Sequence, residues 1–315
     1  MRRRLPVLLS LVLAAIAALT LTATAGAAVV TKTISYGPFT IPAGAGDPHD
    51  HHSMGEVPNR QIDNIAKPCT NCSIVGARPA LVYADGSSAN LDTGPMLHHA
   101  VFSAKGKGKA DATCGGAERF FASGNERTPL DVSGLPYGYG VGKADSWSLL
   151  IELMNWATEA KTVSMQVTWT YATGTDATSR KPIRPTWHGS DVCGLAEFAA
   201  PFGFSDTHFD STAPLSGAVI STIGHVHDHG VSVETTNETR GTSICTSTAA
   251  TGETPGYVTP DGRRHVSSLT QCTADPVARV ARGDLLQVHA TYNVPAGHHA
   301  VEDAMGIMIL YVNPS

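Results

Sequence analysis

The segment from Ala218 to Val233 constrains the fold of this chain more than any other. Its apolar residues recur at every second position, and that period predicts a β-strand. Side chains two positions apart lie on the same face of a strand. His225 and His227, with His229 next in the series, would therefore present imidazoles at a spacing that one metal ion can bridge. A pH-sensing cluster and a solvated polar face are the alternatives, but solvated faces usually mix Lys, Glu, Ser and Thr, so a metal site is favoured.

The rest of the chain also consists of short apolar runs separated by turn residues, and it has no long stretch with helical periodicity. The predicted strands are 30–36, 81–83, 97–102, 147–153, 163–171, 218–233, 242–246, 257–258, 277–280, 285–291 and 305–312. The polar, proline-terminated segment 173–185 predicts a linker. We therefore expect an all-β protein with two tandem antiparallel β-sandwich domains, at residues 29–172 and 186–315.

Residues 1–28 have the composition of a secretory signal peptide, with an arginine-rich start, an apolar run from Leu5 to Leu21 and small residues up to Ala28. A membrane anchor is the alternative, but the Ala-rich run and the cleavage-like site favour removal. No second apolar run of spanning length follows, so we expect a secreted protein without a membrane span after cleavage. The net charge of -5 and the lack of basic runs argue against a nucleic-acid partner.

All six cysteines follow residue 28, and an even number in an exported chain indicates disulfides. Cys69 and Cys72 have the spacing of a zinc knuckle or a thioredoxin-like motif. The sequence has no second such pair and no βαβ pattern around them, so a structural disulfide is preferred. Cys245 and Cys272 are the only cysteines after the histidine strand, so we predict that they pair with each other. The other four would pair within or onto the first domain: Cys69, Cys72, Cys114 and Cys193.

Three motifs occur in a specific order: Leu97-His98-His99-Ala100-Val101-Phe102, Gly224-His225-Val226-His227 and Asp303-Ala304-Met305-Gly306. In this order they are similar to the type II copper, ascorbate-dependent monooxygenases, the family of peptidylglycine α-hydroxylating monooxygenase and dopamine β-monooxygenase. Segments 120–124, 135–142 and 282–286 also resemble parts of that family. The resemblance covers nearly the whole chain after residue 28, and three ordered motifs are more specific than one His-x-His.

The resemblance implies two copper ions, one in each jelly-roll-like domain, facing each other across a solvent cleft. His225, His227 and Met305 would hold the catalytic copper, where dioxygen and a small-molecule substrate react. Imidazole binds both copper oxidation states and a soft thioether stabilises Cu(I), so this ligand set suits the role. His98 and His99 would hold a second copper, which transfers electrons from a donor such as ascorbate.

The second centre departs from the family pattern. Adjacent residues on a regular strand point to opposite faces, so His98 and His99 can share an ion only where a bulge bends the backbone. The family's third ligand there is a histidine, and the matching position here is Met154, which would favour Cu(I). Met308, three residues after Met305, should point to the opposite face and belong to the core.

The substrate positions also depart from the pattern. In peptide-hydroxylating members, an arginine before the His-x-His and an asparagine and a tyrosine after the methionine hold the substrate carboxylate. The matching residues here are Ile223, Ile307 and Ile309, which cannot bind a carboxylate. Peptide amidation is not expected, and a small apolar or amphipathic substrate is favoured.

The C-terminal half also resembles the stress-up-regulated nodulin-like proteins, through Cys245 and Cys272 around segment 256–258 and through Gly283-Asp284 before a strand. That resemblance implies no substrate. The leading hypothesis is a secreted copper-dependent monooxygenase. The others are a non-catalytic copper-binding or copper-buffering protein and a structural cell-surface sandwich. A zinc hydrolase is disfavoured, because Met305 is a poor zinc ligand and no general-base Glu adjoins the His-x-His. Nothing in the sequence indicates the oligomeric state.

Overall fold

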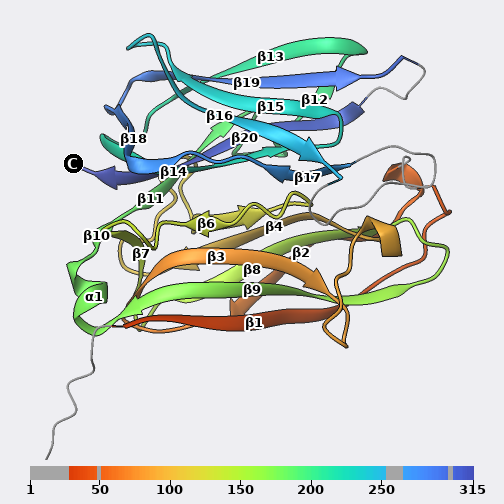
Figure 1. Ribbon diagram of the computed structural model, residues 1–315, viewed down its shortest axis with the longest axis horizontal. Helices are drawn as coiled ribbons and strands as arrows, with labels where there is room; N and C mark the ends of the chain where they lie inside the picture. The colour runs from red at the N-terminus through yellow and green to blue at the C-terminus, as the bar shows by residue number, and fades with distance from the viewer. Residues whose placement is uncertain (1–27, 48–50, 253–264, 297–300) are drawn as a thin grey trace, which may run out of the picture.

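Apolar and polar residues alternate along many of the strands, and the strands form two stacked β-sandwiches (Figure 1). The computed structural model describes residues 28–47, 51–252, 265–296 and 301–315. Its sheets are antiparallel apart from one short parallel pair, β7 with β10. The prediction of an all-β fold with two sandwiches is therefore confirmed.

The N-terminal sandwich contains two sheets. One has the strand order β1-β9-β3-β7-β10, with β6 beside β3. Its strands are β1 (Ala28–Ile41), β3 (Cys72–Val82), β6 (Leu130–Asp131), β7 (Tyr137–Val141), β9 (Lys161–Thr173) and β10 (Lys181–Pro182). The other sheet, here called the interface sheet, has the order β2-β8-β4-β5. Its strands are β2 (Gly55–Ile65), β4 (Pro95–Lys105), β5 (Glu118–Ser123) and β8 (Ser146–Asn155).

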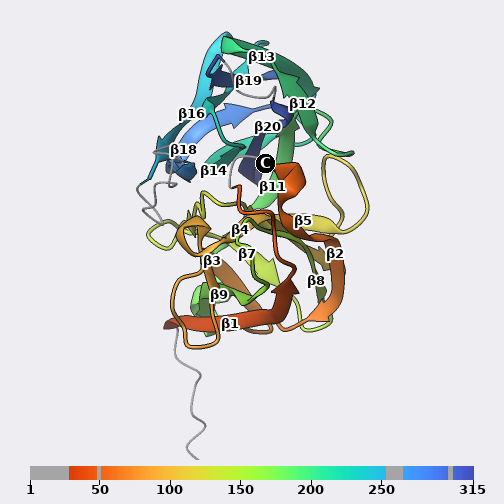
Figure 2. The ribbon, with the colours of Figure 1, turned by 90° about the vertical axis from the view of Figure 1, so that its right-hand side faces the viewer.

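The C-terminal sandwich lies above the interface sheet in Figure 2. Its inner sheet has the order β11-β20-β14-β18, with β12 beside β20. The strands are β11 (Arg184–Gly189), β12 (Glu197–Ala200), β14 (Gly217–Val226), β18 (Thr273–Val280) and β20 (Val301–Pro314). Its outer sheet has the order β13-β19-β15-β16-β17. The strands are β13 (Gly203–Thr212), β15 (Gly230–Asn237), β16 (Thr242–Thr251), β17 (Val266–Leu269) and β19 (Leu285–Val294).

Strand β20 is buried on both faces and joins the two cores. Met305, Ile307 and Ile309 belong to the apolar cluster that extends from the N-terminal sandwich. Met308 and Leu310, on the opposite face, belong to the core of the C-terminal sandwich. The period of two along a strand therefore separates the two methionines, as predicted for Met308.

The predicted strand 218–233 is wrong as a single element. It is two strands, β14 in the inner sheet and β15 in the outer sheet. The turn that joins them contains the backbone hydrogen bond from Gly230 N to His227 O at 3.0 Å. His229 has a positive φ of 68°, a conformation that ends a strand and removes this residue from the series of His225 and His227.

Several other sequence-based expectations fall on short elements or outside the described residues. The segment 173–185 contains α1 (Gly174–Ser179) and β10 before β11 begins. The remaining short helices are η1 (His51–Ser53) and η2 (Leu91–Thr93). Residues 1–27 and the predicted strand 257–258 lie outside the described residues. Among the helices that the structure describes, none has the length and apolar character needed to cross a membrane.

The three disulfides agree with the predicted pairing. Cys245 bonds to Cys272 within the C-terminal sandwich. Cys69 bonds to Cys72, so this pair is structural. The third bond joins Cys114, before β5, to Cys193, between β11 and β12, and thereby fastens the C-terminal sandwich to the N-terminal one.

Candidate metal centre

A β-bulge brings His98 and His99 to one acidic partner. Between β4 and β8 the register passes from Leu97 opposite Leu153 to His99 opposite Glu152, so His98 is the extra residue. The oxygens of Glu152 lie 3.4 Å from His98 Nδ1 and 3.5 Å from His99 Nε2. The bulge that two adjacent histidine ligands require is therefore present, and the donor atoms of these three residues lie within 4.8 Å of one another.

His225, on β14, and His227, in the turn after it, approach this pair directly. The ring centroids of His98 and His227 are 4.8 Å apart, and those of His225 and His227 are 5.1 Å apart. The four residues form one group, called here the histidine cluster. The expected arrangement, with a solvent cleft between the two pairs, is not found at His98 and His227, whose rings lie side by side. Asp303 adds a carboxylate, with Oδ2 4.0 Å from His227 Nδ1.

Met305 is positioned by strand pairing. In the β14–β20 ladder His225 lies opposite Ile307 and Val226 opposite Gly306, and the next pair along would be His227 with Met305. The buried phenol of Tyr292 fixes both backbones, because its oxygen accepts hydrogen bonds from His227 N at 3.0 Å and Met305 N at 3.1 Å. It also donates to Met305 O at 2.6 Å.

A buried carboxylate orients His225. Glu126 Oε1 lies 3.1 Å from His225 Nδ1 and accepts a hydrogen bond from Gly124 N at 2.9 Å. Gly124 permits this approach, since a Cβ there would lie 2.5 Å from Glu126 Oε2 and 2.6 Å from His225 Cε1. His225 Nε2 is buried and has no hydrogen-bond partner in the part of the chain that the structure describes. An imidazole with a carboxylate behind Nδ1 and a bare Nε2 is the usual form of a metal-binding histidine.

The electrostatics keep these groups in the states that bind metal. Burial raises the pKa of Glu126, but His225 and the nearby backbone N–H groups lower it by a larger amount. The pKa of Glu126 therefore lies below its ordinary value. Burial, and then the neighbouring His98, lower the pKa of His99 to about 4. At neutral pH Glu126 is therefore ionised and His99 is neutral, with a lone pair available to a cation.

Exchanging Glu126 for Gln should weaken metal binding by His225. The amide keeps the size of the side chain but removes the charge that fixes the tautomer, and losing such a partner costs about 10- to 100-fold in metal affinity. Copper titration of Glu126→Gln beside the unchanged protein measures this loss. Glu159→Gln is the control, because Glu159 is an exposed residue that pairs with Lys161. Equal affinity in Glu126→Gln and the unchanged protein would contradict this role.

Met154, the third ligand predicted from the family resemblance, lies two residues beyond Glu152 on β8. It lies opposite Met96 in the β4–β8 ladder and is buried in an apolar cluster with Met54, Leu91 and Met96. Glu152 is the residue next to the bulge, so the geometry favours Glu152 over Met154 as the third donor. The sequence predicted a soft thioether, that of Met154, as the third donor, whereas the residue beside the bulge is Glu152, which offers a hard carboxylate oxygen.

A mostly apolar cavity of about 180 Å³ lies beside the histidine cluster, between the interface sheet and the inner sheet. His99, His225 and Met305 reach its wall, together with Trp187 and Leu195. The three isoleucines predicted at the substrate positions also line it: Ile223, Ile307 and Ile309. The cavity therefore has the lining of a site for an apolar molecule, with donor atoms of the histidine cluster at one side.

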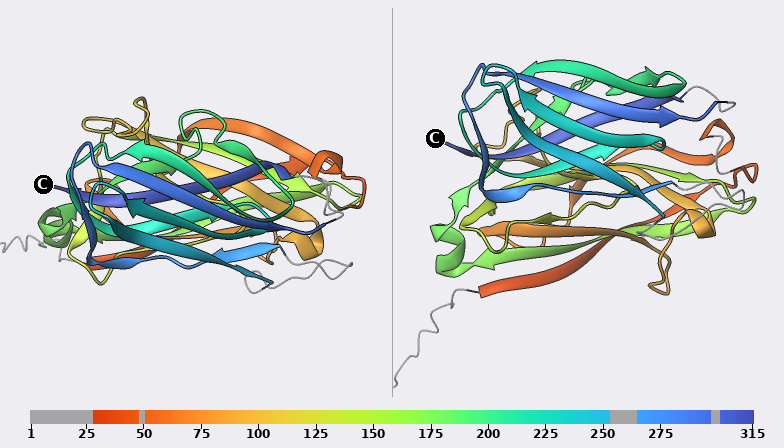
Figure 3. Two further views of the ribbon diagram at one scale, coloured as in Figure 1. Left: turned by 90° about the horizontal axis from the view of Figure 1, so that it is seen from above. Right: turned by 45° about the horizontal axis from the view of Figure 1, so that its top comes forward.

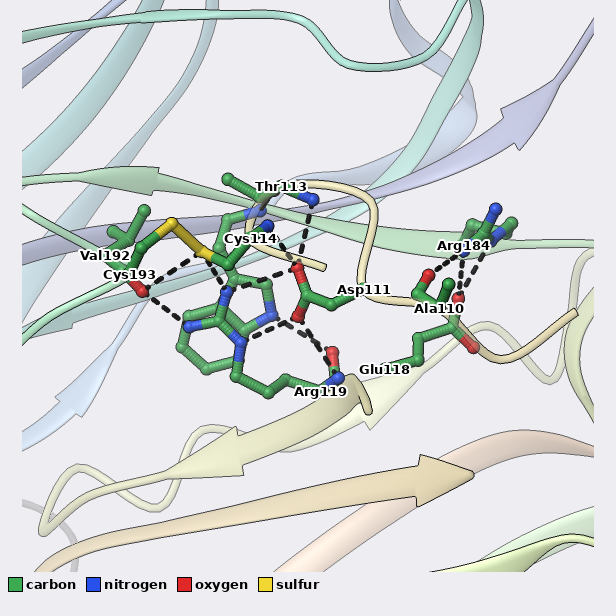
Figure 4. A network of polar contacts seen from close by, with 10 residues as sticks. Ala110, Asp111, Thr113, Cys114, Glu118, Arg119, Arg184, Val192 and Cys193 are labelled. Carbon is green, nitrogen blue, oxygen red and sulfur yellow. Dashed lines mark hydrogen bonds and ion pairs between the residues drawn. A yellow bond between two sulfur atoms is a disulfide. The ribbon is translucent and has the colours of Figure 1, made fainter. Parts of the chain in front are cut away.

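Arg119 also contributes to the cavity wall, but a network at the sandwich interface occupies its charge (Figure 4). Its Nε donates to Asp111 Oδ2 at 2.7 Å, and its Nη1 donates to Val192 O at 2.6 Å. Burial raises the pKa of Asp111, and Arg119 with nearby backbone N–H groups lowers it more strongly. The network and the Cys114–Cys193 disulfide together hold the loop that contains Val192 and Cys193 at the edge of the cavity.

Sequence reasoning missed several residues of this centre. Glu152 had a signal, because it is the only charged residue in the predicted strand 147–153. Asp303 stands in the third motif but was not expected near the histidines, and Glu126 and Tyr292 had no comparable signal. Glu126 sits in a polar loop. Tyr292, on β19, reaches His227 only when the outer sheet packs on the inner sheet, and Asp303 reaches it only when β20 pairs with β14.

Comparison with known proteins finds relatives that are named as probable copper-dependent oxygenases. The chain is 27% identical over 303 residues to "Probable copper-dependent oxygenase M1" of Phoma sp., covering 89% of this chain and 72% of the relative. It is 28% identical to "Probable copper-dependent oxygenase clz3" of Cochliobolus lunatus, covering 74% of this chain and 76% of the relative. This chain is thus a distant homologue of probable copper-dependent oxygenases.

Among solved structures, the capsid protein VP54 of PBCV-1 aligns with 91% of this chain and 94% of its own, at 10% identity and a TM-score of 0.30. A likeness that weak supports no conclusion. The model of the family described as Stress up-regulated Nod 19 matches residues 155–314. This match covers half of the chain, and the chain therefore belongs to the Stress up-regulated Nod 19 family.

Proposed function

We propose that the protein is an exported copper-dependent monooxygenase that oxidises a small apolar substrate, using dioxygen and a reductant such as ascorbate. The net reaction takes one C–H bond, one dioxygen molecule, two electrons and two protons to an alcohol and water. The homology to probable copper-dependent oxygenases supports the copper chemistry. The observation that carries the proposal is His225, whose Nδ1 is held by buried Glu126 while Nε2 has no partner among the described residues, at the wall of an apolar cavity.

The donor set fits copper. His225, His227 and Met305 would hold one ion, since two imidazoles and a thioether accommodate both Cu(I) and Cu(II). His98 and His99 would hold the other with Glu152. Bound copper supplies the one-electron chemistry that activates dioxygen. Copper also explains the use of Met305, which is a poor ligand for zinc.

The chain's own residues have separate tasks in this proposal. The isoleucines of the cavity and Trp187 bind the apolar part of the substrate beside His225 and exclude water. None of these isoleucines offers a charge to a carboxylate, so a neutral substrate is preferred. Glu126 keeps His225 in one tautomer, and Tyr292 sets the backbones of His227 and Met305.

The proposal is tested by copper content together with ascorbate-driven oxygen uptake in the purified protein. We expect two copper ions at the histidine cluster of each chain and oxygen uptake that requires both copper and ascorbate. His225→Ala should lose one of the ions and the oxygen uptake. Tight copper binding without any ascorbate-dependent uptake would instead favour a copper-buffering protein, and absence of copper binding would leave the cluster without a metal role.

Met305 and Met308 offer a matched pair for testing the thioether ligand. Both are buried methionines of β20, but they lie on opposite faces of the strand. In the Cu(I) protein, X-ray absorption should detect a sulfur scatterer that disappears in Met305→Ile and persists in Met308→Ile. A sulfur signal that survives in Met305→Ile would show that the ligand assignment is wrong.

A further inference from the structure

The outer sheet carries a second group of donor side chains on its solvent face, away from the sandwich interface. Along β13 exposure alternates with period two, so residues 204, 206, 208, 210 and 212 face solvent. Asp206 and His208 lie on this face, with His289 of the neighbouring strand β19. The left view of Figure 3 looks down on this sheet.

Strand pairing brings the three side chains together. His208 lies directly opposite His289, and their ring centroids are 4.2 Å apart. Asp206 precedes His208 by two residues and therefore shares its face. Its Oδ2 lies 3.0 Å from His208 Nε2 and 3.2 Å from His289 Nδ1. Two imidazole nitrogens therefore converge on a single carboxylate oxygen.

We propose that Asp206, His208 and His289 form a binding site for a late first-row divalent cation such as Zn²⁺. A tetrahedral zinc site with bonds of about 2.0–2.1 Å has neighbouring donor atoms about 3.3 Å apart. The two nitrogen–oxygen separations here, 3.0 and 3.2 Å, match that spacing. The ion takes the place of the N–H protons between the rings and the carboxylate, and each metal-bound neutral imidazole then has its single proton on its other nitrogen.

The surroundings favour a cation at this position. The side chains of His208, Asp206 and His289 are 45%, 40% and 22% exposed, so a water molecule can complete the coordination. Both ion pairs of Asp206 among the described residues are with these histidines. Burial raises the pKa of Asp206, but the two histidines lower it by a larger amount. The carboxylate is therefore ionised at neutral pH. Glu234, opposite His289 on β15, adds a second negative charge to this face.

A metal ion at this position has a structural consequence. β13 is an edge strand of the outer sheet, and β19 is its partner there. Coordination by His208 from one strand and His289 from the other ties the edge strand to the sheet. Because the ion binds the folded state, the melting temperature should rise with the zinc concentration.

Zinc titration of the purified protein, followed by calorimetry and by thermal unfolding, tests the site. His208→Gln and His289→Gln should each bind one zinc ion per chain fewer than the unchanged protein, or bind it about 100-fold more weakly, since a lost ligand costs at least as much as a lost outer partner. Both variants should also lose the zinc-dependent rise in melting temperature that comes from this site.

Two further variants keep the test independent of the histidine cluster. Asp210→Asn changes the next solvent-facing residue of β13, which accepts a hydrogen bond from Gln287, and it should bind zinc like the unchanged protein. His225→Ala should retain the zinc ion of the outer sheet. Equal zinc stoichiometry and affinity in His208→Gln, His289→Gln and the unchanged protein would overturn the proposal.

Discussion

Replacing Tyr292 with Phe is expected to lower the free energy of unfolding by about 3 kcal/mol, because each buried polar group left without its partner costs about 1–3 kcal/mol. The Tyr292 hydroxyl bonds with His227 N, Met305 N and Met305 O, and phenylalanine leaves all three groups without it. The ring itself is retained, so no large cavity forms. Because His227 and Met305 lose their common anchor, copper affinity should also fall, by about 10-fold.

Tyr311 provides the matched control for Tyr292. It is equally buried, and its hydroxyl makes one hydrogen bond, to Phe120 O at 3.1 Å. Tyr311→Phe should cost about 1 kcal/mol, the usual value for one hydrogen bond, and should leave copper affinity unchanged. Urea unfolding of both variants, with and without copper, gives the comparison. Similar losses of stability in the two variants would mean that the Tyr292 hydroxyl does not anchor the centre.

The fold was predictable to the extent that it depends on local patterning. The period of two predicted an all-β chain, and in β20 it assigned Met305 and Met308 to opposite faces, as the structure has them. The error at 218–233 has a local cause as well. The apolar alternation continues through the turn, and the positive φ of His229 that reverses the chain leaves no gap in that pattern.

The candidate site was predictable only in part, because its histidines are local motifs and their partners are not. His98 and His99 can be found from the sequence, but the bulge that joins them to Glu152 depends on the register between β4 and β8. Glu126 lies 99 residues from His225 along the chain, and the Tyr292 anchor depends on the position of β19. The closeness of His98 to His227 depends on how the two sandwiches pack, which no single motif encodes.

Acidification from pH 6.5 to pH 4 should destabilise the protein through His188, by about 3 kcal/mol from this residue alone. His188 is fully buried on β11, where its ring hydrogen-bonds with the hydroxyls of Thr186 at 2.9 Å and Ser211 at 2.8 Å. Burial lowers the pKa of this imidazole to about 4. The unfolded chain takes up a proton near pH 6.5, whereas the folded chain does not until about pH 4. The contribution of His188 to the free energy of unfolding is therefore fully present above pH 6.5. It decreases as the pH falls from 6.5 to 4, and His188 causes no further loss of stability below pH 4.

His188→Gln removes the titrating group and keeps side-chain donors and acceptors for both hydroxyls. Between pH 6.5 and 4.5, its stability should fall less steeply than that of the unchanged protein, by about 1 kcal/mol per pH unit. Ser211→Ala is the control: it deletes one hydroxyl partner but leaves the imidazole buried, so it should lose stability by a similar amount at every pH and keep the slope. Urea unfolding across this range measures all three proteins. If His188→Gln has the slope of the unchanged protein, the acid sensitivity arises from other buried groups, such as His99, whose pKa is also lowered to about 4.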